Sequence, residues 1–194
     1  MTSGKPIHSV LIVSASRQLY DCFKEILPGG QYAPIAHVTS ASEAKRMLLS
    51  SEFDIIIVNT PLADEFGVDF ATDLADGLAG VLLLVKNDSY EQISYQTEDS
   101  GVLTMAKPAH RQALYAAVKL LTAMNARLRK MEQKNKTLQE KMTDIRLINR
   151  AKWLLIENLG MSEKDAHYYI EKQAMDQRIS RREIAGQIIF TYEK

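Results

Sequence analysis

The sequence predicts an α/β domain built on a parallel sheet, followed by a long helix and a small helical bundle. Three observations support this prediction. Five short apolar runs alternate with amphipathic stretches over about the first 124 residues. The segment from His110 to Leu159 contains neither proline nor glycine. Two marked helix starts follow this segment, at Ser162 and Ser180.

The apolar runs are the expected strands of the first domain. Their Val, Ile and Leu residues are continuous, which suits strands buried on both faces of a parallel sheet that has helices on either side. In such sheets, functional sites lie at the carboxyl ends of the strands. The strands are expected at Val10–Val13, Ile35–Val38, Asp54–Val58, Val81–Val85 and Gly101–Met105, and the helices near residues 17–27, 41–50, 67–77, 88–96 and 109–124.

Residues 8–124 resemble the receiver domain of two-component response regulators, which has the α/β flavodoxin-like (CheY-like) fold. The resemblance rests on the length, the strand spacing and the Lys107-Pro108 step after the fifth strand. It implies two acidic residues after the first strand that hold Mg²⁺ and an aspartate after the third strand that accepts phosphate. It also implies a Ser or Thr after the fourth strand.

The chain departs from this pattern at each of these positions except Lys107. Ser14 and Ala15 replace the acidic pair, Asn59 replaces the phosphate acceptor, and Val85 replaces the hydroxyl residue. Mg²⁺ prefers several anionic oxygens, and an amide is not a phosphate-accepting nucleophile. We therefore predict a pseudo-receiver that binds no metal or cofactor and is not phosphorylated. Its switching, if any, would come from contact with a regulatory protein or ligand. Alternatively, Ser14, Asn59 and Lys107 only satisfy polar groups at the strand ends.

The segment from His110 to Leu159 is rich in good helix formers and predicts one long helix with coiled-coil periodicity. With Leu114 at position a, the a and d positions are mostly apolar over more than four heptads. Asn135 at an a position favours a parallel two-stranded pairing. We predict a homodimer through residues 125–142, with Leu128, Met131, Asn135, Leu138 and Met142 at the interface. Alternatively, the stripe packs within the chain, as its part up to Leu121 must do to complete the first domain.

Two N-capping motifs predict two further helices after the long one. Ser162 with Asp165 starts the first of them, and Ser180 with Glu183 starts the second. Together with the end of the long helix they form a three-helix bundle. Its predicted core residues are Leu147, Ala151, Leu154, Leu155, Ala166, Ile170, Ala174, Ile184 and Ile188.

The segment from residue 138 to residue 192 resembles the ANTAR domain, an RNA-binding antiterminator module. The features that carry the resemblance are Ala151-Lys152, Leu155, Gly160, Glu163, Ala166, Ala174-Met175 and Ile184-Ala185. The resemblance implies an all-α ANTAR domain over residues 143–194 that acts as a dimer. Such domains recognise paired small RNA hairpins in a leader transcript and prevent formation of a transcription terminator. Trp153 departs from the pattern, and it could either pack in the core or offer a stacking surface. Of the two, we expect packing.

The charge of the chain is divided unevenly. Residues 1–110 carry 7 Lys and Arg against 14 Asp and Glu, whereas residues 111–194 carry 17 against 10. A basic half suits a polyanion, and RNA loops are bound by cations on the backbone and planar groups on splayed bases. The predicted RNA-binding residues are Arg146, Arg150, Lys152, Tyr169 or its neighbour Tyr168, Arg178, Arg181 and Arg182. Alternatively, about half of these are a solvated face.

The leading prediction is an RNA-binding transcription antitermination regulator in the cytoplasm. One alternative is a DNA-binding response regulator, because helix-turn-helix outputs are also basic three-helix units. A second is a scaffold that dimerises through its coiled coil and binds no nucleic acid. An enzyme is not expected, since the sequence has no phosphate-cradling glycine loop, metal-ligand spacing or nucleophile elbow. No apolar run is long enough to span a bilayer, and a single cysteine, Cys22, gives no internal disulfide.

Overall fold

The computed structural model describes residues 7–193, so Lys194, the last residue of the predicted ANTAR domain, lies outside the described residues. The chain divides into two compact units between Lys130 and Met131. The division falls inside the helix α5 (Arg111–Leu159), which contributes residues to both units. No described helix is both long and apolar enough to cross a membrane.

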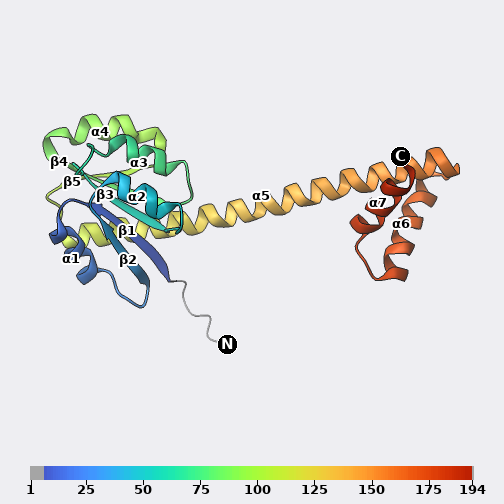
Figure 1. The fold of residues 1–194 in the computed structure, drawn as a ribbon, viewed down its shortest axis with the longest axis horizontal. Coiled ribbons are helices and arrows are strands. Elements are labelled where there is room, and N and C mark those ends of the chain that lie inside the picture. The colour runs from blue at the N-terminus through green and yellow to red at the C-terminus, as the bar shows by residue number, and fades with distance from the viewer. Residues whose placement is uncertain (1–6, 194) are drawn as a thin grey trace. The chain divides into compact units, whose positions relative to one another are not determined.

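The first unit is a five-stranded parallel sheet with helices on both faces (Figure 1). The strand order is β2-β1-β3-β4-β5, which places β2 and β5 at the edges. In chain order the elements are β1 (His8–Ser14), α1 (Arg17–Ile26), β2 (Tyr32–Val38), α2 (Ala41–Leu48), β3 (Ile55–Asn59), α3 (Val68–Ala75), β4 (Gly80–Lys86), the 3-10 turn η1 (Asn87–Ser89), α4 (Tyr90–Thr97), the 3-10 turn η2 (Glu98–Ser100), β5 (Leu103–Lys107) and the start of α5. The predicted alternation of strands and helices is confirmed.

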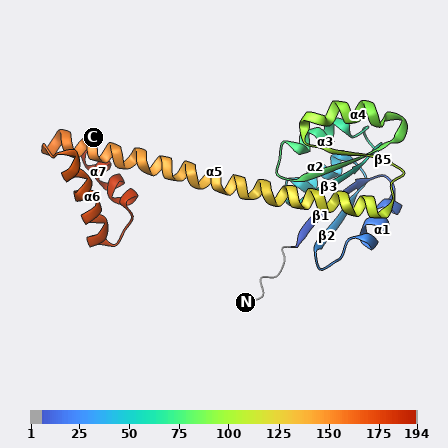
Figure 2. The same cartoon turned by 180° about the vertical axis from the view of Figure 1, so that it is seen from behind.

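Two hydrophobic clusters fill the spaces on the two sides of the sheet. One joins strand residues such as Leu11 and Val58 to α2, α3 and α4. The other joins their neighbours, such as Val10 and Ile57, to α1 and the start of α5, which Figure 2 shows from behind. Because both clusters take residues from the same strands, apolar runs are needed at consecutive positions. The prediction of strands buried on both faces is therefore confirmed.

The fifth strand begins two residues later than predicted. Gly101 follows η2 with a φ of +79°, a left-handed conformation that L side chains rarely adopt. The chain turns at this glycine and becomes extended only at Leu103. The shift makes Lys107 the last residue of β5. It therefore lies at the carboxyl ends of the strands, as does Asn59, the last residue of β3.

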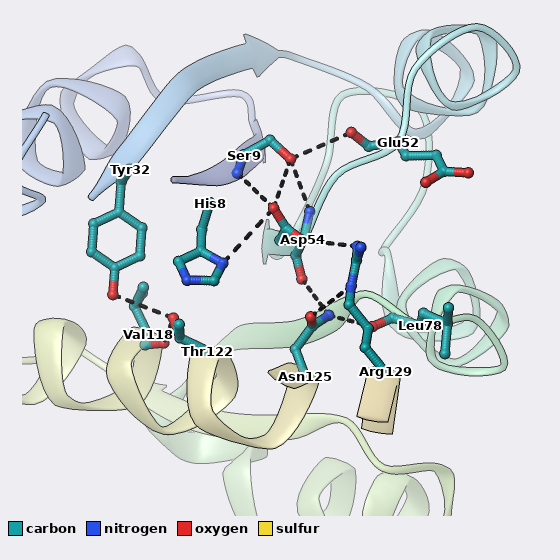
Figure 3. Close-up of polar contacts among 10 residues, drawn as sticks. All are labelled: His8, Ser9, Tyr32, Glu52, Asp54, Leu78, Val118, Thr122, Asn125 and Arg129. Atoms are coloured by element: carbon teal, nitrogen blue, oxygen red, sulfur yellow. Dashed lines mark hydrogen bonds and ion pairs between the residues drawn. The ribbon is translucent and has the colours of Figure 1, made fainter. Parts of the chain in front are cut away.

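A polar cluster around Asp54 attaches α5 to the other end of the sheet, where the strands begin (Figure 3). One carboxylate oxygen of Asp54 accepts hydrogen bonds from the backbone and hydroxyl of Ser9, and the other is 2.8 Å from the guanidinium of Arg129. Asn125 donates to the backbone carbonyls of Asp54 and Leu78 and accepts from Arg129. These contacts fix α5 to the first unit as far as Arg129.

The second unit packs the end of α5 against α6 (Glu163–Gln177) and α7 (Arg181–Tyr192). Its core contains all nine predicted residues, with Leu147 only partly buried. Both predicted N-caps are confirmed: Ser162 accepts from the backbone of Asp165, and Ser180 forms a reciprocal capping box with Glu183. Each cap satisfies an amide that the helix start would otherwise leave without a partner.

The expectation that Trp153 packs in the core is wrong, because its side chain is 60% exposed. Ala151, Leu154 and Leu155 form the buried face of α5 at this point. An α-helix turns by about 100° per residue, so Trp153 lies about 200° around the helix from both Ala151 and Leu155. The indole is therefore on the solvent side of α5.

Candidate nucleic-acid interface and strand-end pocket

The polar residues predicted at the strand ends of the first unit form one hydrogen-bonded cluster. The Nδ2 of Asn59 donates to the Oγ of Ser14 at 2.9 Å. The Nζ of Lys107 donates to the Oδ1 of Asn59 at 2.6 Å and also to the backbone carbonyl of Thr60. The hydroxyl of Ser14 is also bonded to the backbone of Ser16. An open cavity of about 300 Å³, lined in part by Asn59 and Lys107, lies beside this cluster.

The other two predicted pocket residues do not join the cluster. The side chain of Ala15 is exposed, and Val85 is fully buried in the core on the side of α2, α3 and α4. Burial of Lys107, and to a smaller extent the nearby Lys86, lowers the pKa of the Lys107 ammonium. Within residues 7–193, no three His, Cys, Asp or Glu side chains come together to hold a metal ion. The cluster thus offers an amide, a hydroxyl and a cation, and no carboxylate to act as a nucleophile.

In the second unit, four of the six predicted RNA-binding cations already contact a carboxylate. The side chain of Lys152 is only 16% exposed, whereas the other three are more open to solvent. Exposed ion pairs of this kind contribute up to about 1 kcal/mol, so an RNA phosphate has to compete with each of them. The pairs are Lys152 with Glu163 at 3.0 Å, Arg181 with Glu171 at 2.9 Å, Arg182 with Asp144 at 2.9 Å, and Arg150 with Glu193.

The remaining two predicted cations, Arg146 and Arg178, are exposed, and no carboxylate among residues 7–193 forms an ion pair with either. Arg178 ends α6 in a left-handed conformation with φ 55° and ψ 37°. Its amide donates to the carbonyl of Met175 at 3.3 Å, and the next amide, of Ile179, donates to the carbonyl of Ala174 at 3.1 Å. This is the Schellman pattern, in which glycine is the usual left-handed residue.

The two neighbouring tyrosines of α6 have different surroundings. Tyr169 is 37% exposed and lines a groove between α6 and α7 together with Leu155 and Ile188. Tyr168 is 63% exposed and lies on the side of α6 away from its buried row. Lys164 and Lys172, which are not among the predicted RNA-binding residues, lie one turn before and one turn after Tyr168. Each lies four residues from Tyr168, and this spacing is the signal in the sequence that places all three on one helix face.

The surplus of positive charge lies mainly outside the second unit. Residues 111–130 carry 5 Lys and Arg and no Asp or Glu, whereas residues 131–194 carry 12 against 10. The basic half of the sequence is therefore largely the start of α5, which belongs to the first unit. For the second unit, the positions of individual cations matter more than the net charge.

The predicted dimerisation residues form an exposed apolar stripe on α5. Leu128, Met131, Leu138 and Met142 are each 49–58% exposed, and Asn135 is also exposed. Leu114 and Leu121, which precede them in the heptad pattern, are buried against the sheet. The expectation that this earlier part completes the first domain is confirmed, and the later part has no apolar partner among the described residues.

The second unit matches the model of the ANTAR domain over residues 136–189. Over 168 residues the chain is 24% identical to the transcriptional regulatory protein PdtaR of Mycobacterium tuberculosis. This alignment covers 86% of this chain and 82% of that protein. Over 94 residues it is 31% identical to the aliphatic amidase regulator of Pseudomonas aeruginosa. This second alignment covers 48% of this chain and 47% of that protein.

The first unit is similar to solved receiver domains. The signal receiver domain of an HD domain-containing protein from Pseudomonas fluorescens aligns with a TM-score of 0.57 and 18% identity over 67% of this chain and 96% of that one. The chemotaxis response regulator CheY4 of Vibrio cholerae aligns with a TM-score of 0.52 and 18% identity over 60% of this chain and 99% of that one. These likenesses show that the first unit has the receiver fold.

Proposed function

We propose that this chain, an ANTAR-domain protein whose first unit has the response-regulator receiver fold, is an RNA-binding transcription antitermination regulator. The observation that carries the proposal is the ANTAR match over residues 136–189. The similarity to PdtaR supports it, because the 168 aligned residues cover most of both proteins and therefore extend over both units of this chain. The chain would bind hairpins of a leader transcript and thereby prevent a competing terminator from forming.

The physical basis of such binding is local. Unpaired RNA bases can stack on aromatic rings and guanidinium planes, while cations contact the backbone. The second unit has exposed aromatic rings and exposed cations on a folded three-helix scaffold. A rigid scaffold of this kind limits the entropy lost when the RNA binds.

The proposed active form is a parallel dimer joined through residues 125–142. The exposed stripe of Leu128, Met131, Leu138 and Met142 supports this, since a second copy would cover it. Two linked ANTAR domains could bind two hairpins of one transcript, and the second binding event would then be intramolecular. Sedimentation equilibrium of the full chain at micromolar concentration should give a dimer. A monomer throughout this range would refute the dimer, but would leave RNA binding to be judged by its own assay.

The proposed first unit is a pseudo-receiver that takes up no phosphate. The closed cluster of Ser14, Asn59 and Lys107 supports this, because Asn59 uses its side-chain amide in two hydrogen bonds and offers no nucleophilic oxygen. A regulatory protein or a small ligand would then be the input that reaches this unit.

Selection from an RNA pool tests the proposed function. The full chain is offered tandem hairpins with randomised loops, in the presence of excess duplex DNA. We expect enriched hairpins that duplex DNA does not displace and whose affinity falls as salt rises. Equal or tighter binding of duplex DNA would support a DNA-binding regulator in place of the proposed function. A chain that retains neither nucleic acid would support the scaffold.

A further inference from the structure

We propose that the solvent face of α6, formed by Lys164, Tyr168 and Lys172, is the surface on which unpaired RNA nucleotides lie, and that Arg178 at the C-terminal end of the helix adds a further cation. We refer to these four residues together as the α6 face. This inference rests on the proposed RNA binding and adds to it the side chains that make the contact. In it, Tyr168 stacks on a splayed base and the three cations contact the flanking phosphates.

The geometry of α6 places Lys164, Tyr168 and Lys172 together. Residues four apart on an α-helix are neighbours on its surface, so Lys164, Tyr168 and Lys172 form one row. The buried row of the same helix is Ala166, Ile170 and Ala174. Tyr168 lies about 200° around the helix from Ile170, so the α6 face points away from the core of the unit.

The cations of the α6 face have no ion pair among the described residues that a phosphate would have to displace. No carboxylate among residues 7–193 forms an ion pair with Lys164, Lys172 or Arg178. Glu171, the acid next to Lys172 in sequence, is already bonded to Arg181 at 2.9 Å. An RNA phosphate at the α6 face therefore displaces no existing ion pair, in contrast to one at Arg181.

Tyr168 supplies the planar group. Its side chain is 63% exposed, and its hydroxyl has no hydrogen-bond partner among the described residues. A base stacked on the ring would cover apolar surface that is otherwise in water. Stacking of this kind is worth about 1–3 kcal/mol per base, which corresponds to about 5- to 150-fold in affinity.

Arg178 gives an independent reason to look at this end of α6. An L residue in the left-handed conformation costs about 1–2 kcal/mol relative to the right-handed one, and glycine would avoid most of this cost. A long cation nevertheless occupies the position, is exposed and has no carboxylate partner among the described residues. Strained residues of this kind cluster at functional sites.

The test uses the full chain and one hairpin enriched from the tandem-hairpin pool, with 2-aminopurine in place of a loop adenine. Tyr168→Phe keeps the ring and should bind as wild type, with the same quenching of the 2-aminopurine fluorescence. Tyr168→Leu should bind about 5- to 150-fold more weakly and should lose the quenching. Lys164→Ala and Lys172→Ala should each reduce the slope of log affinity against log salt by about 0.7 to 0.9. Lys119→Ala, which removes an exposed lysine on α5 in the first unit, is the matched control and should leave the slope unchanged.

The outcomes separate this inference from the function on which it rests. If wild type binds the hairpin and Tyr168→Leu binds it equally well with full quenching, the α6 face is not the contact surface and only this inference fails. Equal salt slopes for wild type, Lys164→Ala and Lys172→Ala would overturn it in the same way. If wild type binds no hairpin at all, the proposed function itself fails and the inference fails with it. Circular dichroism of each variant should match that of wild type, which checks that the helices remain folded.

Discussion

Replacing Arg178 by glycine should stabilise the second unit and weaken its RNA binding at the same time. Relief of the left-handed strain gains about 1–2 kcal/mol, because glycine adopts φ 55° without a steric clash. The greater freedom of glycine in the unfolded chain takes back about 0.5–1 kcal/mol. We expect a net gain of about 0.5–1 kcal/mol, or a rise of about 2–8 °C in the melting temperature of a unit this small. The lost cation should reduce the salt slope of hairpin binding by about 0.7–0.9.

Hydrogen exchange of the α6 amides, followed by mass spectrometry on the full chain, measures the stability of this unit separately from that of the first. Arg178→Ala is the matched control, since alanine loses the same charge and keeps the strained conformation. It should weaken binding as much as Arg178→Gly does, without added protection of α6. If the glycine variant is no better protected than the alanine variant, the strain argument is wrong. If both variants bind with the salt slope of wild type, Arg178 does not contact phosphate.

Four further changes test other parts of the structure. The full chain incubated with acetyl phosphate and Mg²⁺ should show no acid-labile phosphate by mass spectrometry. Asn59→Asp alone should also remain unmodified, because no acidic pair holds the metal. Uptake of phosphate by wild type would refute the pseudo-receiver. Asn135→Leu should lower the dissociation constant of the dimer and allow larger oligomers, seen by sedimentation equilibrium, whereas weaker association would argue against Asn135 at the interface. In urea titrations, Asp54→Asn should lower the free energy of unfolding of the first unit by about 1–3 kcal/mol, whereas Arg129→Gln should lower it by less than about 1 kcal/mol. Equal losses would mean that the ion pair of Asp54 with Arg129 contributes more than its hydrogen bonds from Ser9. Hydrogen bonds from the backbone and side chain of Ser42, and from the backbone of Ala41, lower the pKa of Asp64 from 3.8 to about 2. The stabilising effect of Asp64 is therefore present above pH 4 and is lost as the pH falls towards 2. Asp64→Asn should remove that part of the acid dependence of the urea midpoint.

Local rules predicted much of this structure from the sequence. The capping box at Ser180 and Glu183 depends on residues three apart, and the buried strands depend on runs of Val, Ile and Leu, so both patterns can be read along the chain. The apolar neighbours of Gly101 predict a strand at this position, but they do not indicate the left-handed turn that the glycine adopts. Periodicity also placed Trp153 correctly on α5, and the error lay in assigning the core to a large apolar side chain that the helix turns towards solvent.

The candidate interface was harder to predict because its charges are paired over long distances in sequence. Arg182 and Asp144 are 38 residues apart, and Arg150 meets Glu193 across 43. These contacts depend on how α7 packs against α5, and a single sequence gives no sign of them. Net charge was misleading for a different reason, because most of the positive surplus belongs to the start of α5 and not to the three-helix unit.

The order of the strands has a consequence for how copies of this protein avoid aggregation. An edge strand offers unpaired amides and carbonyls to any other strand, and proteins commonly place proline or charge there to prevent such pairing. Here the edge strand β2 contains Pro34, which has no amide hydrogen to donate. Two copies brought close together are thereby hindered from joining their sheets into a continuous ribbon. In the proposed dimer, self-association uses apolar side chains on α5, so the two copies could separate again without unfolding either sheet.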